Sequence, residues 1–140
     1  MNIENVKKAI AIMKRAGEVN MEYWQTSKHG YDFKTTEAEL HECGTAACFA
    51  GWVAVSPEWK QSGGGVADGG IPEIKGLSGI LAISEWLGIN YIDVNYLICG
   101  NCIEIDGLKD DMYSKYYNKL WSNVNANDVI EKLEELLGKG

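Results

Sequence analysis

The chain has 140 residues, with 20 acidic against 13 basic side chains and a formal net charge of −7. Its length is that of one ordinary domain, and 46% hydrophobic with 24% charged residues is the composition of a globular protein rather than a disordered one. The negative charge argues against direct nucleic-acid binding, which requires a basic surface.

The first segment has the spacing of an amphipathic helix that ends near Gly17. It lacks the uninterrupted apolar core of a signal peptide, and the longest apolar stretch, residues 46–55, is too short to span a bilayer. We therefore expect a single domain, residues 1–140, that resides in the cytoplasm without membrane contact. Thiols are normally reduced in that compartment.

The middle of the chain contains one clear helix between two irregular segments. Residues 18–42 are mixed and polar, and we interpret them as a structured excursion. A second helix is expected to begin after Thr45, a good N-cap, and to run to about Ser56, where Pro57 closes it. The glycine-rich residues 61–70 are typical of a mobile loop.

Two further helices follow the glycine-rich loop. Ser78 is expected to cap a third helix that ends at Gly88. Asn90 with Asp93 resembles a capping box for a fourth helix, Tyr91–Ile98.

The C-terminal part is expected to be helical as well. Leu108–Trp121 is tyrosine-rich, and Asn125 with Asp128 opens a last helix with one apolar stripe. No run of alternating strands is present, so the predicted fold is mainly α: one compact domain of about five helices with a glycine-rich loop. The expected core consists of Ile10, Met13, Phe49, Val53, Ile80, Ile83, Leu87, Leu97, Ile130, Leu133 and Leu137.

The stretch HECGTAACFAGW, residues 41–52, holds the first candidate for chemistry. If Thr45 is the N-cap, Cys48 lies at the third helical position, where free backbone N–H groups lower a thiol pKa. A cysteine enzyme would then use Cys48 as nucleophile, His41 as base and the N–H groups of residues 44–46 as donors. The alternative, which we favour, is that Cys48 packs the start of a buried helix, since free cysteine is among the most buried residue types.

A structural zinc site is a second possibility. Cys99 and Cys102 have the C-x-x-C spacing of half a zinc site, but Cys99 also fits an ordinary helix end before a glycine. The remaining candidates, His41, Cys43 and Cys48, lack the tight second pair. No metal or other cofactor is therefore favoured, although zinc stays open. A disulfide between Cys43 and Cys48 is sterically conceivable, but the compartment argues against a permanent one.

Two other segments offer weaker signals. The glycine-rich loop has no lysine followed by Ser or Thr and no preceding strand, so it does not match a phosphate-binding loop. The tyrosine-rich run around residues 112–121 offers stacking surfaces for a base or nucleotide, but aromatic residues at helical spacing are more often core.

The residues from Cys43 to Trp52, CGTAACFAGW, resemble the C-G-T-x-x-C-x-A-G-W signature of small, poorly characterised proteins encoded by phages and prophages. The likeness continues in the amphipathic first helix, in the segment AISEWLGI at residues 82–89 and in the Leu-rich last helix. The glycine-rich loop and the pair Cys99 and Cys102 depart from that pattern. The resemblance implies a phage accessory protein that acts in the bacterial cytoplasm.

Three hypotheses of function follow, and we favour the first. It is a non-enzymatic protein that binds a host protein or a small molecule such as a nucleotide, with counter-defence as one role. The other two are the Cys48 enzyme and a zinc-stabilised interaction domain. In the first hypothesis the 43–52 turn forms the ligand surface, with Trp24 or Trp52 as an aromatic wall and residues 61–70 as a lid. The expected ligand-binding residues are Trp24, Cys43, Gly44, Thr45, Cys48 and Trp52.

Overall fold

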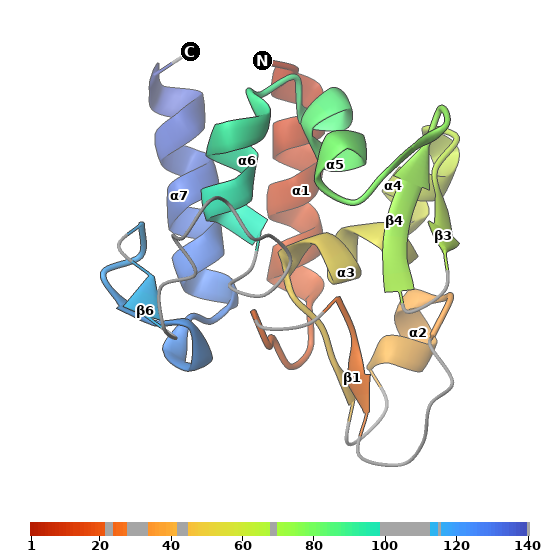
Figure 1. Cartoon of the computed structure of the whole chain (residues 1–140), viewed down its shortest axis with the longest axis horizontal. Helices are drawn as coiled ribbons and strands as arrows, with labels where there is room; N and C mark the ends of the chain where they lie inside the picture. The colour runs from red at the N-terminus through yellow and green to blue at the C-terminus, as the bar shows by residue number, and fades with distance from the viewer. Residues whose placement is uncertain are drawn as a thin grey trace.

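The computed structural model shows a mixed α/β domain (Figure 1). It describes residues 1–21, 24–27, 34–41, 45–67, 70–98, 113–114 and 116–139. Helices and short antiparallel strands alternate along the chain, so the prediction of a mainly α, or all-α, fold is wrong. The strands escaped detection because each has only two to four residues, too few for an alternating pattern to show.

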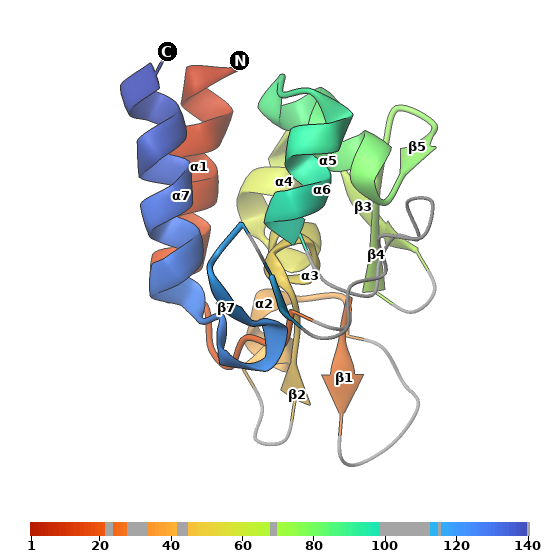
Figure 2. The same cartoon turned by 60° about the vertical axis from the view of Figure 1, so that its left-hand side comes forward.

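The first and last helices pack side by side in opposite directions (Figures 1 and 2). Helix α1 spans Ile3–Arg15, and the Asn2 side chain accepts a hydrogen bond from the Asn5 amide at 3.1 Å. Helix α7 spans Ala126–Lys139. The predicted capping box before it is confirmed, because Asn125 and Asp128 exchange reciprocal side-chain to backbone bonds of 3.1 and 2.9 Å. Strong local signals thus placed both helices correctly.

The central helix starts later than predicted. Helix α3 spans Phe49–Val55, with Cys48 rather than Thr45 at its N-cap. Strand β2, Thr45–Ala46, instead pairs with strand β1, Thr26–Ser27. All seven residues of α3 are buried, so the core forms around it. Tertiary packing of this apolar segment therefore overrides the capping preference of Thr45.

Two short helices connect α3 to the rest of the domain. Helix α4, Pro57–Gln61, follows directly, since Ser56 ends α3 and caps α4 by accepting from the Trp59 amide at 3.2 Å. Helix α2, Glu37–Leu40, precedes the central turn and is capped by Thr36.

The segment that was predicted to be a mobile loop contributes instead to a three-stranded sheet. Strand β3, Gly65–Ala67, pairs with β4, Ile71–Ile74, which pairs with β5, Leu77–Ser78. The sheet lies on the side of the molecule away from α7 (Figure 1). Ser78 therefore belongs to a strand and does not cap the next helix, whose N-cap is Gly79.

The next two helices end or begin where the sequence indicated. Helix α5 spans Ile80–Leu87 and ends at Gly88, which is left-handed with φ 65°. Helix α6 spans Tyr91–Ile98, and the Asn90 side chain accepts from the Ile92 amide at 2.7 Å.

The predicted helix at Leu108–Trp121 is wrong in the part that the structure describes. Strands β6, Tyr113–Ser114, and β7, Lys119–Leu120, form a hairpin, and a 3₁₀ turn follows at Trp121–Asn123. Residues 108–112 and 115 lie outside the described part. Tyr117 nevertheless belongs to the core, as expected for this run, and its hydroxyl donates to the Leu97 carbonyl at 3.0 Å.

The predicted core is buried except for Leu137, which is only partly covered. Within the described ranges, no helix is long and apolar enough to cross a membrane.

Candidate functional site

The Cys48 thiol is sealed inside the domain. Cys48 occupies the N-cap of α3 and has no exposed surface. Burial raises the pKa of the thiol to about 12, and the amide groups of residues at the helix start lower it only in part. The predicted lowering of this pKa by the helix start is therefore wrong, since the cost of burying a thiolate outweighs the helix-end charge. A thiol in this state is a poor nucleophile.

The other described side chains of the signature use their polar atoms within the fold. The Thr45 hydroxyl donates to the Leu40 carbonyl at 2.7 Å, and the Trp52 indole N–H donates to the Glu18 carbonyl at 3.0 Å. Both residues are buried. Trp52 also packs its ring against His41, with the ring centroids 4.9 Å apart. These groups join the central turn to the preceding segments and present little surface to a ligand.

Gly51 explains why the signature has a glycine before its tryptophan. A Cβ atom at Gly51 would lie 1.8 Å from the Trp24 carbonyl oxygen and 2.8 Å from the Ala47 Cβ. Helix α3 therefore approaches the backbone at Trp24 as closely as only glycine allows. The Trp24 ring itself is half-buried and lies near Gly79. The structure thus brings the Trp24 backbone against the signature, whereas the sequence interpretation assigned the Trp24 ring as an aromatic wall for a ligand.

Only some of the candidate zinc ligands belong to the part of the chain that the structure describes. Cys43, Cys99 and Cys102 lie outside the described residues, as does Gly44. Among the residues that are described, no group of three His, Cys, Asp or Glu side chains is placed to hold a metal ion. His41 is described, and its side chain contacts Trp52 and lies 4.0 Å from the Glu37 carboxylate.

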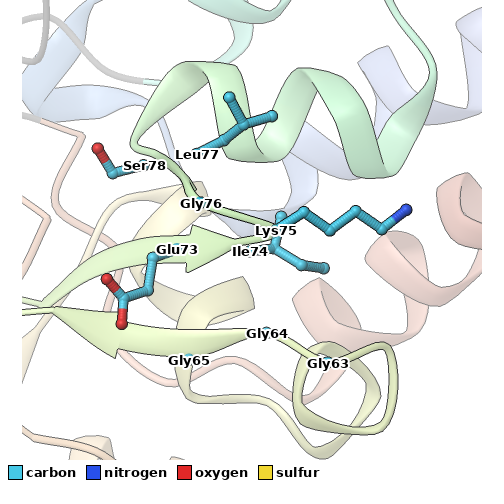
Figure 3. Close-up of a pocket in the computed structure, with 9 residues that line it drawn as sticks. All are labelled: Gly63, Gly64, Gly65, Glu73, Ile74, Lys75, Gly76, Leu77 and Ser78. Carbon is cyan, nitrogen blue, oxygen red and sulfur yellow. The ribbon is translucent and has the colours of Figure 1, made fainter.

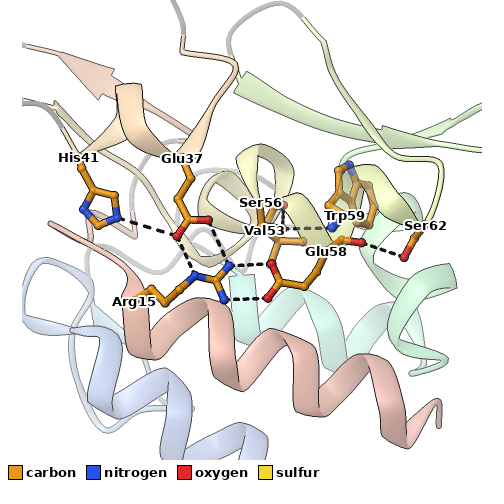
Figure 4. A network of polar contacts seen from close by, with 8 residues as sticks. All are labelled: Arg15, Glu37, His41, Val53, Ser56, Glu58, Trp59 and Ser62. Atoms are coloured by element: carbon orange, nitrogen blue, oxygen red, sulfur yellow. Dashed lines mark hydrogen bonds and ion pairs between the residues drawn. The ribbon is translucent and has the colours of Figure 1, made fainter.

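A polar network that the sequence did not reveal ties three helices together (Figure 4). Arg15, at the end of α1, makes paired hydrogen bonds to Glu37 of α2 at 2.8 and 3.1 Å and to Glu58 of α4 at 2.7 and 2.6 Å. The Arg15 bond holds the pKa of Glu58 below its usual range, and both carboxylates raise the pKa of Arg15. Because every guanidinium edge is engaged, this cluster acts as a clamp for the fold.

An open groove lies on the three-stranded sheet (Figure 3). Its volume is about 500 Å³, and it is lined by Gly63, Gly64, Gly65, Glu73, Ile74, Lys75, Gly76, Leu77 and Ser78. The strand register places Gly65, Glu73 and Ser78 in one row across β3, β4 and β5. Side chains in such a row share a face of the sheet.

Two polar side chains of the groove are available to a ligand, and a third, Lys75, lies 4.0 Å from the Glu85 carboxylate. Glu73 and Ser78 are exposed and paired in the strand register, whereas the Lys75 side chain extends away from both (Figure 3). No hydrogen bond or ion pair joins the Glu73 carboxylate to another described residue. Gly65 adds no side chain beside it: a Cβ there would meet only Glu73 atoms, at 3.6 and 3.7 Å. The row therefore presents one carboxylate and one hydroxyl above a floor of glycine backbone.

Sequence reasoning missed the groove but singled out one of its walls. The glycine run at 63–65 was taken as part of a lid over the 43–52 turn, whereas the structure makes it a wall of a separate groove. The sequence feature that could have predicted this hairpin is Gly76, which follows Lys75 in the tight turn between β4 and β5. Both residues have positive φ, 52° and 78°, as a two-residue hairpin turn requires.

Comparisons with protein-family models, with curated proteins and with solved structures each found no match.

Proposed function

We propose that this chain is a non-enzymatic binding protein, and that its ligand occupies the groove on the β3–β4–β5 sheet. The ligand is a small polar molecule or a segment of a host protein that offers hydrogen-bond donors to Glu73. The observation that carries the proposal is the row of Gly65, Glu73 and Ser78, which leaves a carboxylate unpartnered among the described residues in a groove of about 500 Å³.

The dimensions and chemistry of the groove support this function. Its volume falls within the range of about 300–1,000 Å³ that is common for ligand sites. An unpaired carboxylate accepts hydrogen bonds and attracts positive charge, so amine, guanidinium or amide groups match it. The overall charge of −7 would favour the approach of a cationic ligand over an anionic one.

The state of Cys48 supports binding rather than thiol catalysis. A catalytic cysteine needs a thiolate that substrate can reach, and Cys48 combines complete burial with a pKa raised to about 12. The hydroxyl of Thr45 and the indole N–H of Trp52 are likewise bonded to the chain itself.

The resemblance of residues 43–52 to the phage signature suggests a biological role for this binding. A likeness to phage-encoded and prophage-encoded proteins supports a phage accessory factor that acts in the bacterial cytoplasm. Such a factor would work by occupying a host protein or sequestering a small molecule, and counter-defence is one role that this mode of action serves.

The test measures the unfolding temperature of the protein in the presence of each member of a panel of amino acids, amines and nucleotides. A ligand that binds only the folded state raises the unfolding temperature. Each ligand that does so is then titrated against Glu73→Gln, which removes the carboxylate charge, and Gly65→Thr, which fills the groove. Threonine suits this strand, because Gly65 has no positive φ and a Cβ there makes only ordinary contacts. Gly138→Ala, on α7, is the matched control, since no atom lies within 4 Å of the added Cβ.

A ligand of the groove should lose its effect in Gly65→Thr, weaken about tenfold in Glu73→Gln and keep it in Gly138→Ala. For a protein ligand, the same three variants are compared in pull-downs from host lysate. Ligands that stabilise Gly65→Thr as well as the parent would contradict the groove as the site.

A further inference from the structure

A second surface, independent of the groove, is built around two tyrosines. Tyr96 on α6 and Tyr116 in the β6–β7 turn stack with their ring centroids 6.3 Å apart and an angle of 21° between planes. Tyr96 is 44% exposed and Tyr116 is half-buried. We call this pair, with Lys132 and the carboxylates of Asp93 and Glu135, the tyrosine surface.

The tyrosine surface already holds one cation from the chain itself. The Lys132 ammonium lies 4.9 Å from the centroid of the Tyr116 ring and 3.4 Å from the Glu135 carboxylate. A cation over an aromatic face is attracted by the negative charge of the π-electrons. Lys132 therefore shows which kind of charge these rings accept.

Acidic groups from two helices surround the same rings. Asp93 of α6 and Glu135 of α7 are both exposed. Their charges, together with burial as the larger cause, raise the pKa of Tyr116, so both carboxylates act on that ring. Of the two, Glu135 has Lys132 as a partner, whereas no ion pair to a described residue is formed by Asp93. The local charge is thus one cation against two anions.

An apolar side chain extends the surface along α6. Ile92 precedes Tyr96 by four residues, so the two share one helix face, and Ile92 is 49% exposed. An exposed aliphatic group beside an aromatic ring and a carboxylate matches the stem and head of a long basic side chain.

We propose that the tyrosine surface binds a partner protein through an arginine side chain. The guanidinium stacks on the exposed Tyr96 ring and pairs with Asp93, and its aliphatic stem packs on Ile92. Arginine fits better than lysine, because the guanidinium is planar, stacks on aromatic faces and is less strongly hydrated than an ammonium group. The net charge of −7 attracts a basic partner to the protein and repels a second copy of this chain.

The test uses a capped tri-arginine peptide as the probe, titrated by isothermal calorimetry at low salt, with a capped tri-glutamine peptide as the uncharged control. Tyr96→Leu should weaken tri-arginine binding about threefold, which is the size of an exposed cation–π contact. Tyr96→Phe keeps the ring and should restore the parent affinity. Unfolding temperatures of both variants show whether the fold is intact.

Lys132 supplies a second and sharper comparison. Lys132→Gln vacates the Tyr116 ring and releases Glu135, so it should tighten tri-arginine binding about threefold more than Lys7→Gln does. Lys7→Gln makes the same change of net charge at an exposed position on α1. The difference between the two variants therefore isolates the local contact from general electrostatic attraction.

Three results would overturn the proposal. The first is that tri-arginine shows no measurable binding. The second is that Tyr96→Leu binds the peptide as tightly as the parent does, and the third is that Lys132→Gln and Lys7→Gln change the affinity equally. The last two would show that the peptide responds to net charge alone and that the tyrosines only cover the core.

Discussion

The signature turn and the hairpin sheet both depend on glycine, but they use it in opposite ways. At Gly51 a Cβ atom would lie 1.8 Å from a backbone oxygen, so glycine permits two segments to pack closely. At Gly63 and Gly76 an added Cβ would meet no other part of the structure within 4 Å, and glycine supplies the positive φ of exposed turns. Gly64, next to Gly63, is a close-packing glycine like Gly51, because an added Cβ there would lie 2.3 Å from the Trp59 indole nitrogen. A glycine in a motif is therefore informative only once its surroundings are known.

The polar atoms of the two regions differ in the same way. In the signature turn, Thr45 and Trp52 donate to backbone carbonyls of this chain. In the hairpin sheet, Glu73 and Ser78 face outward into the groove. The segment with the most recognisable sequence thus serves chiefly to pack the core, whereas the segment that was predicted to be a mobile loop lines the open groove.

The largest expected effect is on the reactivity of Cys48. With a pKa of about 12 against an ordinary value of 9, only about one Cys48 thiol in ten thousand is ionised at pH 8. Alkylation of Cys48 by iodoacetamide at pH 8 should be at least a thousandfold slower in the native protein than in urea. Peptide mapping by mass spectrometry follows this residue separately from the other three cysteines. Rapid native modification would show that the thiol is accessible and would restore the nucleophile hypothesis.

The next effect concerns the core that the signature builds. Phe49 opens α3 and is fully buried, so Phe49→Ala should lower the free energy of unfolding by about 3–5 kcal/mol. Leu81→Ala is the control, because Leu81 is 52% exposed on α5 and its truncation should cost less than about 1 kcal/mol. Urea unfolding followed by tryptophan fluorescence measures both. A parent-like stability of Phe49→Ala would contradict the placement of α3 in the core.

A third comparison sets the two kinds of glycine against each other. Gly51→Ala forces a Cβ against the Trp24 carbonyl and should destabilise the fold by about 2–3 kcal/mol, although alanine is the better helix former. Gly65→Ala should change stability by less than about 0.5 kcal/mol, because the new methyl group makes only ordinary contacts with Glu73. Equal losses in the two variants would remove the distinction between close packing and open surface.

The sequence was sufficient where local signals were strong. The 3.6-residue periodicity placed α1, Gly88 placed the end of α5, and the capping residues Asn90 and Asn125 placed the starts of α6 and α7. Most of the predicted core is also buried. These signals work because each depends on residues within one or two turns of the chain.

The features that the sequence did not predict depend on contacts between distant parts of the chain. The two-residue strand at Thr45–Ala46 exists because β1 lies beside it, which no local pattern records. The pKa of Cys48 depends on how much of the chain covers it, and the clamp at Arg15 joins residues 22 and 43 positions apart. The row in the groove likewise needs the pairing of β3 with β4, which places Gly65 beside Glu73. Each of these features is set by tertiary contacts rather than by the residues nearby in sequence.

The smallest expected effect is the pH dependence that the Arg15 clamp gives to the signature side of the fold. Arg15 holds the pKa of Glu58 below its usual value near 4.5, so the folded state stabilises the ionised form of this carboxyl group more than the unfolded state does. Its contribution to stability is fully present above about pH 5 and is lost as the pH falls through the lowered pKa. Glu58→Gln should therefore lower the free energy of unfolding by about 1 kcal/mol at pH 7, and the difference from the parent should shrink as the pH falls toward 3. Glu134→Gln, at an exposed position of α7, should show no such convergence. Thermal unfolding at pH 3, 5 and 7 distinguishes the two, and a Glu58→Gln difference that stays constant with pH would mean that the side chain contributes by packing rather than by its charge.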